Sequence, residues 1–261
     1  MISSRTTSNP RNRTRSSRTS SALVLLIVAA AALAPFPAFA QSCPEPLNSA
    51  RRLVLVTSES LKATTGAARM FERASPQDTW QPVGPAEPVV LGGKGMAWGL
   101  GFHQFAVEQE PKKAEGDDRT PAGAYRIGKS FGFEASPQPG YIPIKDDTVC
   151  VDDVTSPAYN TITSRRIVGR KVHGEHMRGV PRYRHGLVVD YPTDAKARGG
   201  SCIFIHIQRS PTSPTAGCVA LPEARVVALQ EFSAPGAVLV TLPQDALGRL
   251  SGCLPALADG Q

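Results

Sequence analysis

The chain has 261 residues, 41% of them hydrophobic, and a formal net charge of +7. Five of its 29 basic residues lie in the first 20 positions, which hold no acid, so residues 41–261 carry 29 − 5 = 24 basic side chains against 22 acidic ones. The positive charge therefore belongs mostly to an N-terminal segment, and it gives no support for a nucleic-acid-binding protein.

The N-terminus has the layout of a secretory signal peptide. Residues 22–34 are wholly apolar, Pro35 ends this run, and residues 38–40 (Ala-Phe-Ala) have the small-x-small pattern of a cleavage site. We therefore expect residues 1–40 to be a signal peptide that is cleaved after Ala40. The alternative is a membrane anchor, which the shortness of the apolar run disfavours.

Residues 41–261 are enough for a single domain, whose core we expect at about 53–242. Glycine and proline occur 23 times each and interrupt short apolar runs, which favours a mainly β fold with a few short helices. The expected elements in chain order are a strand at 53–57, a hairpin of 69–73 and 79–83, a strand followed by a glycine-rich loop within 88–99, strands at 124–127, 186–191 and 202–207, a helix at 222–232 and a strand at 237–243.

All five cysteines lie beyond the predicted signal peptide, where an oxidising compartment favours disulfides. An odd number leaves at least one thiol free. Cys43 and Cys253 are near the two ends of the mature chain, which are often close in space. Cys150 and Cys202 lie in or beside apolar runs. We prefer the pairs 43–253 and 150–202 with Cys218 free, although several cysteines could instead stay reduced and buried.

His206 ends the apolar run 202–207. Strand alternation places Cys202, Phe204 and His206 on one face and three isoleucines on the other. An imidazole titrates near neutral pH, so His206 could serve as general base for a cysteine. A histidine on an apolar strand is more often a core residue, and only its nearness to Cys218 favours the catalytic interpretation.

Cys218 follows a glycine and stands just ahead of the expected helix. Backbone N–H groups at a helix N-terminus would lower the pKa of its thiol. The amides of Gly217, Cys218 and Val219 could hold an oxyanion. A cysteine, a base and oxyanion donors within 13 residues indicate acyl transfer by a cysteine nucleophile.

We expect no metal site and no cofactor. His173, His176 and His185 fall in a loop-rich region without an accompanying Cys-x-x-Cys. The acidic pairs at 117–118 and 152–153 stand beside turn residues, where carboxylates commonly cap turns.

Several separate motifs follow one another along the chain: EGDDRTPAGAYRIG (115–128), CVDDVTSPAYN (150–160), YRHGLVVDY (183–191) and GSCIFIH followed by TAGCVAL (200–206 and 215–221). In this order they resemble the L,D-transpeptidase catalytic domain (YkuD type) of bacterial cell-wall enzymes. The resemblance runs from about Leu53 to Phe232.

The resemblance implies a mixed β sandwich with a helix after the catalytic cysteine, located in the periplasm or cell envelope. It matches Cys218 to the nucleophile that attacks the third-residue carbonyl of a peptidoglycan stem tetrapeptide and His206 to the base. D-alanine then leaves, and an amine of a second stem peptide or of a lipoprotein resolves the thioester without a cofactor. Arg178, Arg119 and Arg184 are candidates for contact with the substrate, since guanidinium groups bind carboxylates well. Tyr183 is a further candidate, because it could line the cleft for the donor peptide.

Two positions depart from the usual family pattern. Ala216 replaces a histidine next to the cysteine motif, and Ala220 stands where an arginine is common. An orienting partner for His206 must then come from elsewhere, for example a backbone carbonyl. The alternatives to transfer are an L,D-carboxypeptidase or amidase that uses water as acceptor, and a non-catalytic peptidoglycan-binding module.

Overall fold

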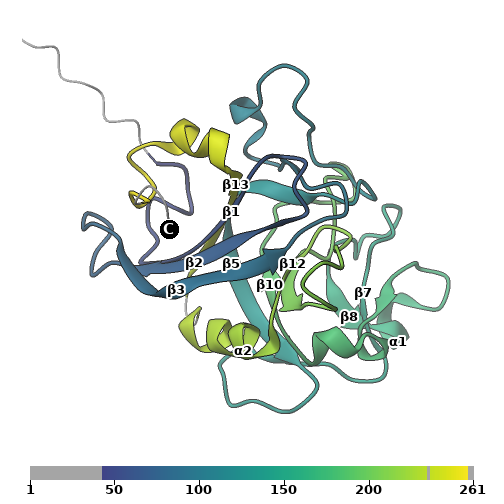
Figure 1. Ribbon diagram of the computed structural model, residues 1–261. Coiled ribbons are helices and arrows are strands. Elements are labelled where there is room, and N and C mark those ends of the chain that lie inside the picture. Colours follow the sequence, from purple (N-terminus) through teal and green to yellow (C-terminus); the bar gives the residue numbers. More distant parts are fainter. Residues whose placement is uncertain (1–42, 234–235, 258–261) are drawn as a thin grey trace, which may run out of the picture. The chain divides into compact units, whose positions relative to one another are not determined.

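The computed structural model describes residues 43–233 and 236–257, and the predicted signal peptide lies outside them. Among these residues ten strands form one mixed sheet (Figure 1). Its strands are β1 (Arg52–Ser58), β2 (Thr65–Glu72), β3 (Gln81–Val90), β4 (Met96–Trp98), β5 (Thr120–Gly132), β6 (Ile142–Pro143), β10 (His185–Val189), β11 (Phe204–Ile207), β12 (Val219–Leu221) and β13 (Val238–Pro243).

Eight of these strands close into a ring. The order is β10-β11-β12-β3-β2-β1-β13-β5, and β5 also pairs with β10. The prediction of a mainly β fold with a few short helices is confirmed. The strand pairing is that of a barrel-like sheet, however, rather than of two separate sheets facing each other as in the expected sandwich.

Most of the expected strands are present, with ends shifted by a few residues. The hairpin forms from β2 and β3, which pair antiparallel from Thr65↔Val90 to Glu72↔Gln81. The strand expected at 202–207 begins only at Phe204, because Cys202 has a left-handed backbone with φ of 54°. β12 was not expected, and it inserts a strand between Cys218 and the helix.

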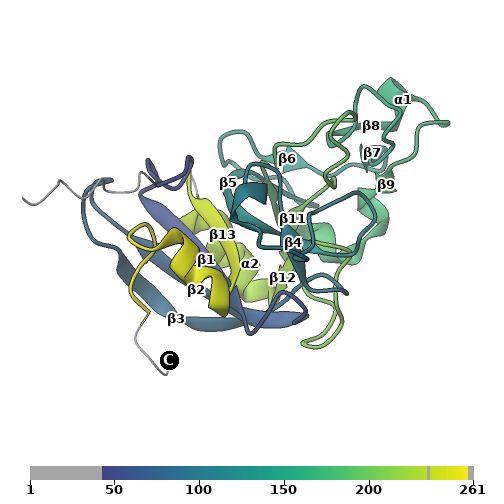
Figure 2. The same cartoon turned by 90° about the horizontal axis from the view of Figure 1, so that it is seen from above.

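A second, small sheet lies apart from β1, β2 and β3 (Figure 2). It contains β7 (Thr148–Cys150), β8 (Ile162–Ser164) and β9 (Glu175–His176), and β8 leads into the one-turn helix α1 (Arg165–Val168). Ser164 caps this helix, since its hydroxyl accepts a hydrogen bond from the Arg166 N–H at 3.1 Å.

Helix α2 (Glu223–Phe232) covers β10 and β11. Its buried Gln230 donates from Nε2 to the carbonyls of Phe131 and Gly186, both at 2.9 Å, and so joins the helix to the β5–β10 pair. A Cβ at Gly186 would lie 2.3 Å from the Phe131 ring, so this close packing requires glycine. Four 3₁₀ helices complete the described elements: His103–Phe105, Met177–Gly179, Pro181–Arg184 and Gln244–Leu250. None of the described helices is long and apolar enough to cross a membrane.

Strand β11 separates two apolar clusters, as its alternation predicts. Ile203, Ile205 and Ile207 belong to the main core. Phe204 belongs to a second buried cluster that also contains Tyr183 and Cys218. Residues on the Phe204 side of β11 therefore face the region that holds the candidate nucleophile.

The described residues contain the two preferred disulfides, Cys43–Cys253 and Cys150–Cys202. Cys218 is free and buried. The second disulfide joins β7 of the small sheet to the segment that enters β11, so it fixes the small sheet next to the strand that carries His206.

Candidate active site

Cys218 is held beside the start of β11. β11 and β12 run parallel with Ile205 opposite Val219, which brings the residue before β12 next to Phe204. The Phe204 N–H donates to Cys218 Sγ at 3.3 Å, and the thiol donates to the Cys202 carbonyl at 3.4 Å. The side chain is 8% exposed. The thiol therefore points toward the start of β11, with only a small part of its surface open.

The backbone around Cys218 is fixed from two sides. The hydroxyls of Thr215 and Thr120 both donate to the Cys218 carbonyl, at 2.7 and 3.3 Å. Gly217 has φ of 141°, and a Cβ there would lie 2.9 Å from the Arg119 carbonyl oxygen. A side chain at position 217 would thus both strain the backbone and clash with the neighbouring loop.

His206 is buried, with 5% of its surface exposed, and lies opposite Ala220 across the β11–β12 pair. Its Nδ1 is 2.8 Å from the Ile207 carbonyl. A carbonyl can only accept a hydrogen bond, so Nδ1 carries the proton and Nε2 keeps a lone pair. The Tyr183 ring packs edge-on against the imidazole, with centroids 5.3 Å apart. The orienting partner of His206 is therefore a backbone carbonyl.

Cys218 and His206 line one cavity of about 550 Å³. Tyr183, Gly217, Ala216 and Ala220 also line it. The described residues show no hydrogen bond between Cys218 and His206, because the thiol bonds instead to the start of β11. Catalytic hydrogen bonds are often long or absent without substrate and form in the complex.

Burial keeps both groups neutral. It raises the pKa of the Cys218 thiol to about 12, although the Phe204 N–H acts in the opposite direction. It lowers the pKa of His206 to about 4, although the bond to the Ile207 carbonyl acts in the opposite direction. The expected thiolate at a helix N-terminus is wrong for this structure, since β12 lies between Cys218 and α2.

The three backbone amides expected to form an oxyanion hole have different environments. The Gly217 N–H already donates to Thr215 Oγ1 at 3.1 Å. Val219 begins β12 and pairs with β11. The Cys218 N–H has no acceptor among the described residues. The Cys218 amide is therefore the donor that is free to bind an oxyanion.

The family model of the L,D-transpeptidase catalytic domain matches residues 69–241, which include the cysteine, the histidine and most of the ring of strands. The protein belongs to the L,D-transpeptidase catalytic domain family. A solved structure, the helical cell shape determining protein Pgp2 from Campylobacter jejuni, is similar over 73% of this chain and 46% of its own, with 17% identity and a TM-score of 0.37. The chain thus spans less than half of that structure. No curated protein matches the chain.

The two departures from the usual family motif both face the cavity. Ala216 and Ala220 line it, so the positions where many family members have a histidine and an arginine add no polar group here. The carbonyl of Ile207 holds the imidazole instead. Any charged contact to a substrate must therefore come from other elements.

Of the four residues expected to contact substrate, only Tyr183 lines this cavity. Arg119 donates to the carbonyls of Lys94 and Met96. Arg178 stacks on the Phe133 ring at 4.2 Å and donates to its carbonyl. Arg184 forms an ion pair with Glu223 at the start of α2. The guanidinium groups of all three arginines are therefore engaged elsewhere, and none lines the cavity of Cys218.

Other charged residues line the same cavity, and of these only Asp118 and Asp152 were considered from the sequence, as members of turn-capping acidic pairs. The cavity is lined by three cations outside the catalytic pair and by four acids: Lys113, Arg182, Arg209, Glu115, Asp118, Asp152 and Glu175. Two positional signals were available. Arg182 directly precedes the YRHGLVVDY motif, and Arg209 follows His206 by three residues.

The three histidines first considered for a metal do not converge. The His173 ring contacts Asp152, the His176 ring contacts the Asp146 carbonyl, and His185 lies 3.9 Å from Glu223. Within the described ranges no group of three or more His, Cys, Asp or Glu side chains could hold a metal ion.

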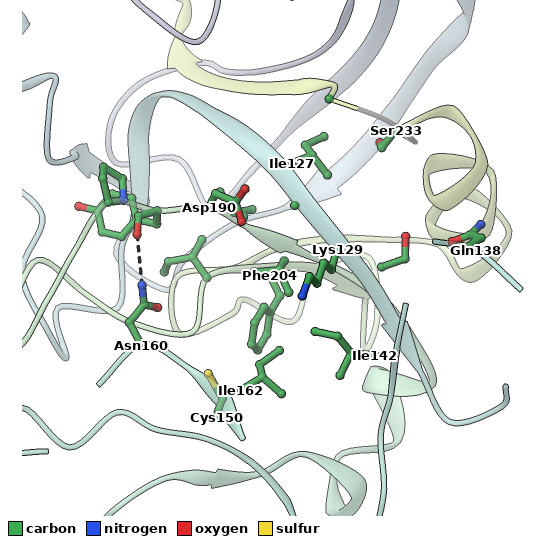
Figure 3. Close-up of a pocket in the computed structure, with 18 of the residues that line it drawn as sticks. Ile127, Lys129, Gln138, Ile142, Cys150, Asn160, Ile162, Asp190, Phe204 and Ser233 are labelled. Carbon is green, nitrogen blue, oxygen red and sulfur yellow. Dashed lines mark hydrogen bonds between the residues drawn. The ribbon is translucent and has the colours of Figure 1, made fainter. Parts of the chain in front are cut away.

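A larger cavity of about 830 Å³ lies beyond the Cys150–Cys202 disulfide. Phe204, Ile142 and Ile162 line it together with Lys129 and Asp190 (Figure 3). Cys150 borders this larger cavity, whereas its disulfide partner Cys202 borders the catalytic one. Neither Cys218 nor His206 lines the larger cavity, so we place the chemistry in the smaller one.

Proposed function

We propose that this protein is a peptidoglycan L,D-transpeptidase with Cys218 as nucleophile and His206 as general base. One observation carries the proposal. Both side chains line one cavity, and the Ile207 carbonyl holds His206 in the tautomer whose Nε2 can accept a proton. Membership of the family supports peptidoglycan peptides as the substrate class.

The reaction has two acyl-transfer steps. Cys218 Sγ attacks the carbonyl of the third residue of a stem tetrapeptide while His206 Nε2 takes the thiol proton. The C–N bond breaks, D-alanine leaves with that proton on its amine, and a thioester remains. An amine of a second stem peptide, or of an envelope lipoprotein, then attacks the thioester. The attacking amine gives its proton to His206, and His206 passes this proton to the sulfur of Cys218 as the thioester C–S bond breaks.

The neutral resting state determines how the first step starts. With the thiol pKa raised to about 12 and the imidazole pKa lowered to about 4, no ion pair exists before substrate arrives. Proton transfer therefore accompanies attack on the carbonyl. The Cys218 N–H, which lacks an acceptor among the described residues, would donate to the oxyanion that forms.

We place this activity in the periplasm or cell envelope. The arginine-rich, apolar N-terminal segment predicts export, and the two disulfides fit an oxidising compartment. The identity of the amine acceptor, stem peptide or lipoprotein, is a separate question that product analysis can answer.

Incubation with a disaccharide tetrapeptide, followed by mass spectrometry of the products, tests the proposal. A cross-linked dimer is the expected product. Tripeptide without dimer would identify an L,D-carboxypeptidase that uses water, and no turnover would leave only a binding module. Cys218→Ala should abolish all products, and His206→Ala should lower the rate by about 10²–10⁴-fold.

A further inference from the structure

The cavity that Cys218 and His206 line contains two guanidinium groups that form no ion pair or side-chain hydrogen bond with any described residue. Its other charged side chains are all engaged: Lys113 with Asp117, Glu115 with Tyr159, Asp118 with Lys94, Asp152 with His173 and Glu175 with Tyr183. Within the described part of the chain, Arg182 and Arg209 form no ion pair and donate no side-chain hydrogen bond. Burial raises the pKa of Glu175, and the charge of Arg182 acts in the opposite direction, but no ion pair or hydrogen bond joins the two side chains. The N–H groups of both guanidinium groups are therefore not used by the described residues of the cavity.

Arg182 is the one of the two whose charge acts on both reacting groups, and it lines the same cavity as they do. It belongs to the 3₁₀ helix Pro181–Arg184, directly before the tyrosine that packs on His206. Its positive charge acts on both Cys218 and His206, since it lowers the pKa of each. Arg209 is exposed and follows the end of β11.

We propose that Arg182 binds the carboxylate of the residue that leaves when Cys218 attacks the donor peptide. This inference rests on the proposed function and names the feature of the donor that the site selects. The leaving residue bears its carboxylate on the carbon attached to the scissile nitrogen, and His206 must deliver a proton to that nitrogen. A group bound at Arg182 therefore lies beside both reacting residues.

The chemistry of the side chain fits this role. A guanidinium binds a carboxylate through two parallel N–H···O bonds, which fixes its orientation as well as its position. Binding by Arg182 would thus orient the scissile C–N bond toward the thiol. A donor whose leaving residue ends in an amide has no negative charge and only one acceptor oxygen, so it would gain much less from Arg182.

Two donor peptides and three variants test the proposal in kinetics. The donors are a disaccharide tetrapeptide with a free C-terminal carboxylate and the same compound as its C-terminal amide. Arg182→Gln should lower kcat/KM for the acid by about 10- to 150-fold, as expected for loss of a charged hydrogen-bonded contact, and should lower kcat/KM for the amide much less. Arg209→Gln should have a smaller effect on the acid. Arg170→Gln, which removes an exposed arginine after α1, should leave both rates unchanged.

A binding measurement separates this proposal from the proposed activity. Titration calorimetry with Cys218→Ala needs no turnover, so it reports on the carboxylate site even if the transfer reaction is not found. The acid should bind more tightly than the amide, and the additional Arg182→Gln change should remove that difference. Equal binding of both peptides by Cys218→Ala, or an equal loss for both peptides on adding Arg182→Gln, would overturn the proposal.

Discussion

At Cys218, burial and hydrogen bonding act on the thiol in opposite directions. The surrounding apolar cluster disfavours a thiolate, whereas the Phe204 N–H favours one, and burial dominates, so the pKa rises to about 12. A resting cysteine in such a setting is protonated at neutral pH. Its reactivity must come from what the substrate brings into the cavity rather than from a preformed thiolate.

Alkylation against pH tests this picture of the resting thiol. Cys218 is the free cysteine of the described residues, so iodoacetamide labelling can be followed by mass spectrometry of one peptide. At pH 7 labelling should be slower than for glutathione, because the thiolate fraction is smaller, and it should rise only at alkaline pH. Faster labelling than glutathione at pH 6–7 would contradict the raised pKa and would favour a preformed thiolate.

The buried His206 makes stability depend on pH. Its pKa is lowered to about 4 in the folded state from an ordinary value of 6.5, so the unfolded chain binds more protons between these values. The contribution of His206 to the free energy of unfolding is fully present above pH 6.5 and decreases as the pH falls from 6.5 to 4. Below pH 4 this contribution changes no further. The full shift corresponds to about 3 kcal/mol.

His206→Asn isolates this contribution, because the asparagine amide can still donate to the Ile207 carbonyl but does not titrate. Urea unfolding of the parent and of this variant at several pH values between 4 and 7.5 shows how the free energy of unfolding of each depends on pH. Between pH 7.5 and pH 4 the free energy of unfolding of the parent should fall by about 3 kcal/mol more than that of the variant. Parallel pH profiles would mean that His206 does not have the lowered pKa.

At the scale of elements, the parallel pair β11–β12 positions Cys218 and His206. The strand at 202–207 was predictable because β-branched and aromatic residues alternate there, and this also placed Phe204 and His206 on one face. β12 was not predictable, since a three-residue apolar run between a glycine turn and a proline fits a helix entry as well as a strand. That one short strand removes the helix terminus from Cys218.

The spacing of Cys218 and His206 predicted that they lie near one another, and both line one cavity. The contacts of the arginines could not be predicted in this way. Arg184 pairs with Glu223 across 39 residues of sequence, and the partner of Arg119 is a backbone carbonyl 25 residues away. Such pairings depend on how distant segments meet, which local sequence does not encode. Which arginine remains unpaired in the cavity, and hence available to a substrate, follows only from the folded structure.

The Cys150–Cys202 disulfide should affect catalysis as well as stability. It joins β7 to the residue whose carbonyl accepts the thiol hydrogen bond of Cys218. In the chain-entropy view a disulfide that closes a loop of this length adds about 4 kcal/mol to the free energy of unfolding. Replacing both cysteines by serine should lower kcat by about tenfold or more even where the protein is still folded, because a misplacement of about 1 Å is costly in catalysis.

Circular dichroism at the assay temperature provides the control for this double variant. It gives the fraction of folded protein, so that kcat can be calculated per folded molecule. Titration of the donor peptide gives KM separately from kcat. An unchanged kcat with a lower melting temperature would mean that the disulfide only stabilises the fold and has no role in holding the nucleophile.

At the scale of the whole molecule, the ends of the described unit are joined away from both cavities. β1 pairs parallel with β13, which brings the first and last long strands side by side, and the Cys43–Cys253 disulfide links the segments beyond them (Figure 1). Arg73 adds to this closure by donating to the carbonyls of Leu47 and Ala50 and stacking on Trp80 at 4.1 Å. His206 lies on β11 and Cys218 directly precedes β12, so closure of the ends and the proposed catalysis should be separable.

Replacing Cys43 and Cys253 together by serine tests this separation. The disulfide spans 210 residues, for which the chain-entropy view gives about 5 kcal/mol of stability, more than for the inner disulfide. Urea unfolding should show this loss, while kcat and KM of the folded protein should equal those of the parent, because neither cysteine lines the catalytic cavity. A fall in kcat for this variant as large as that for the Cys150/Cys202 variant would contradict the separation, since it would mean that any loosening of the sheet reaches Cys218.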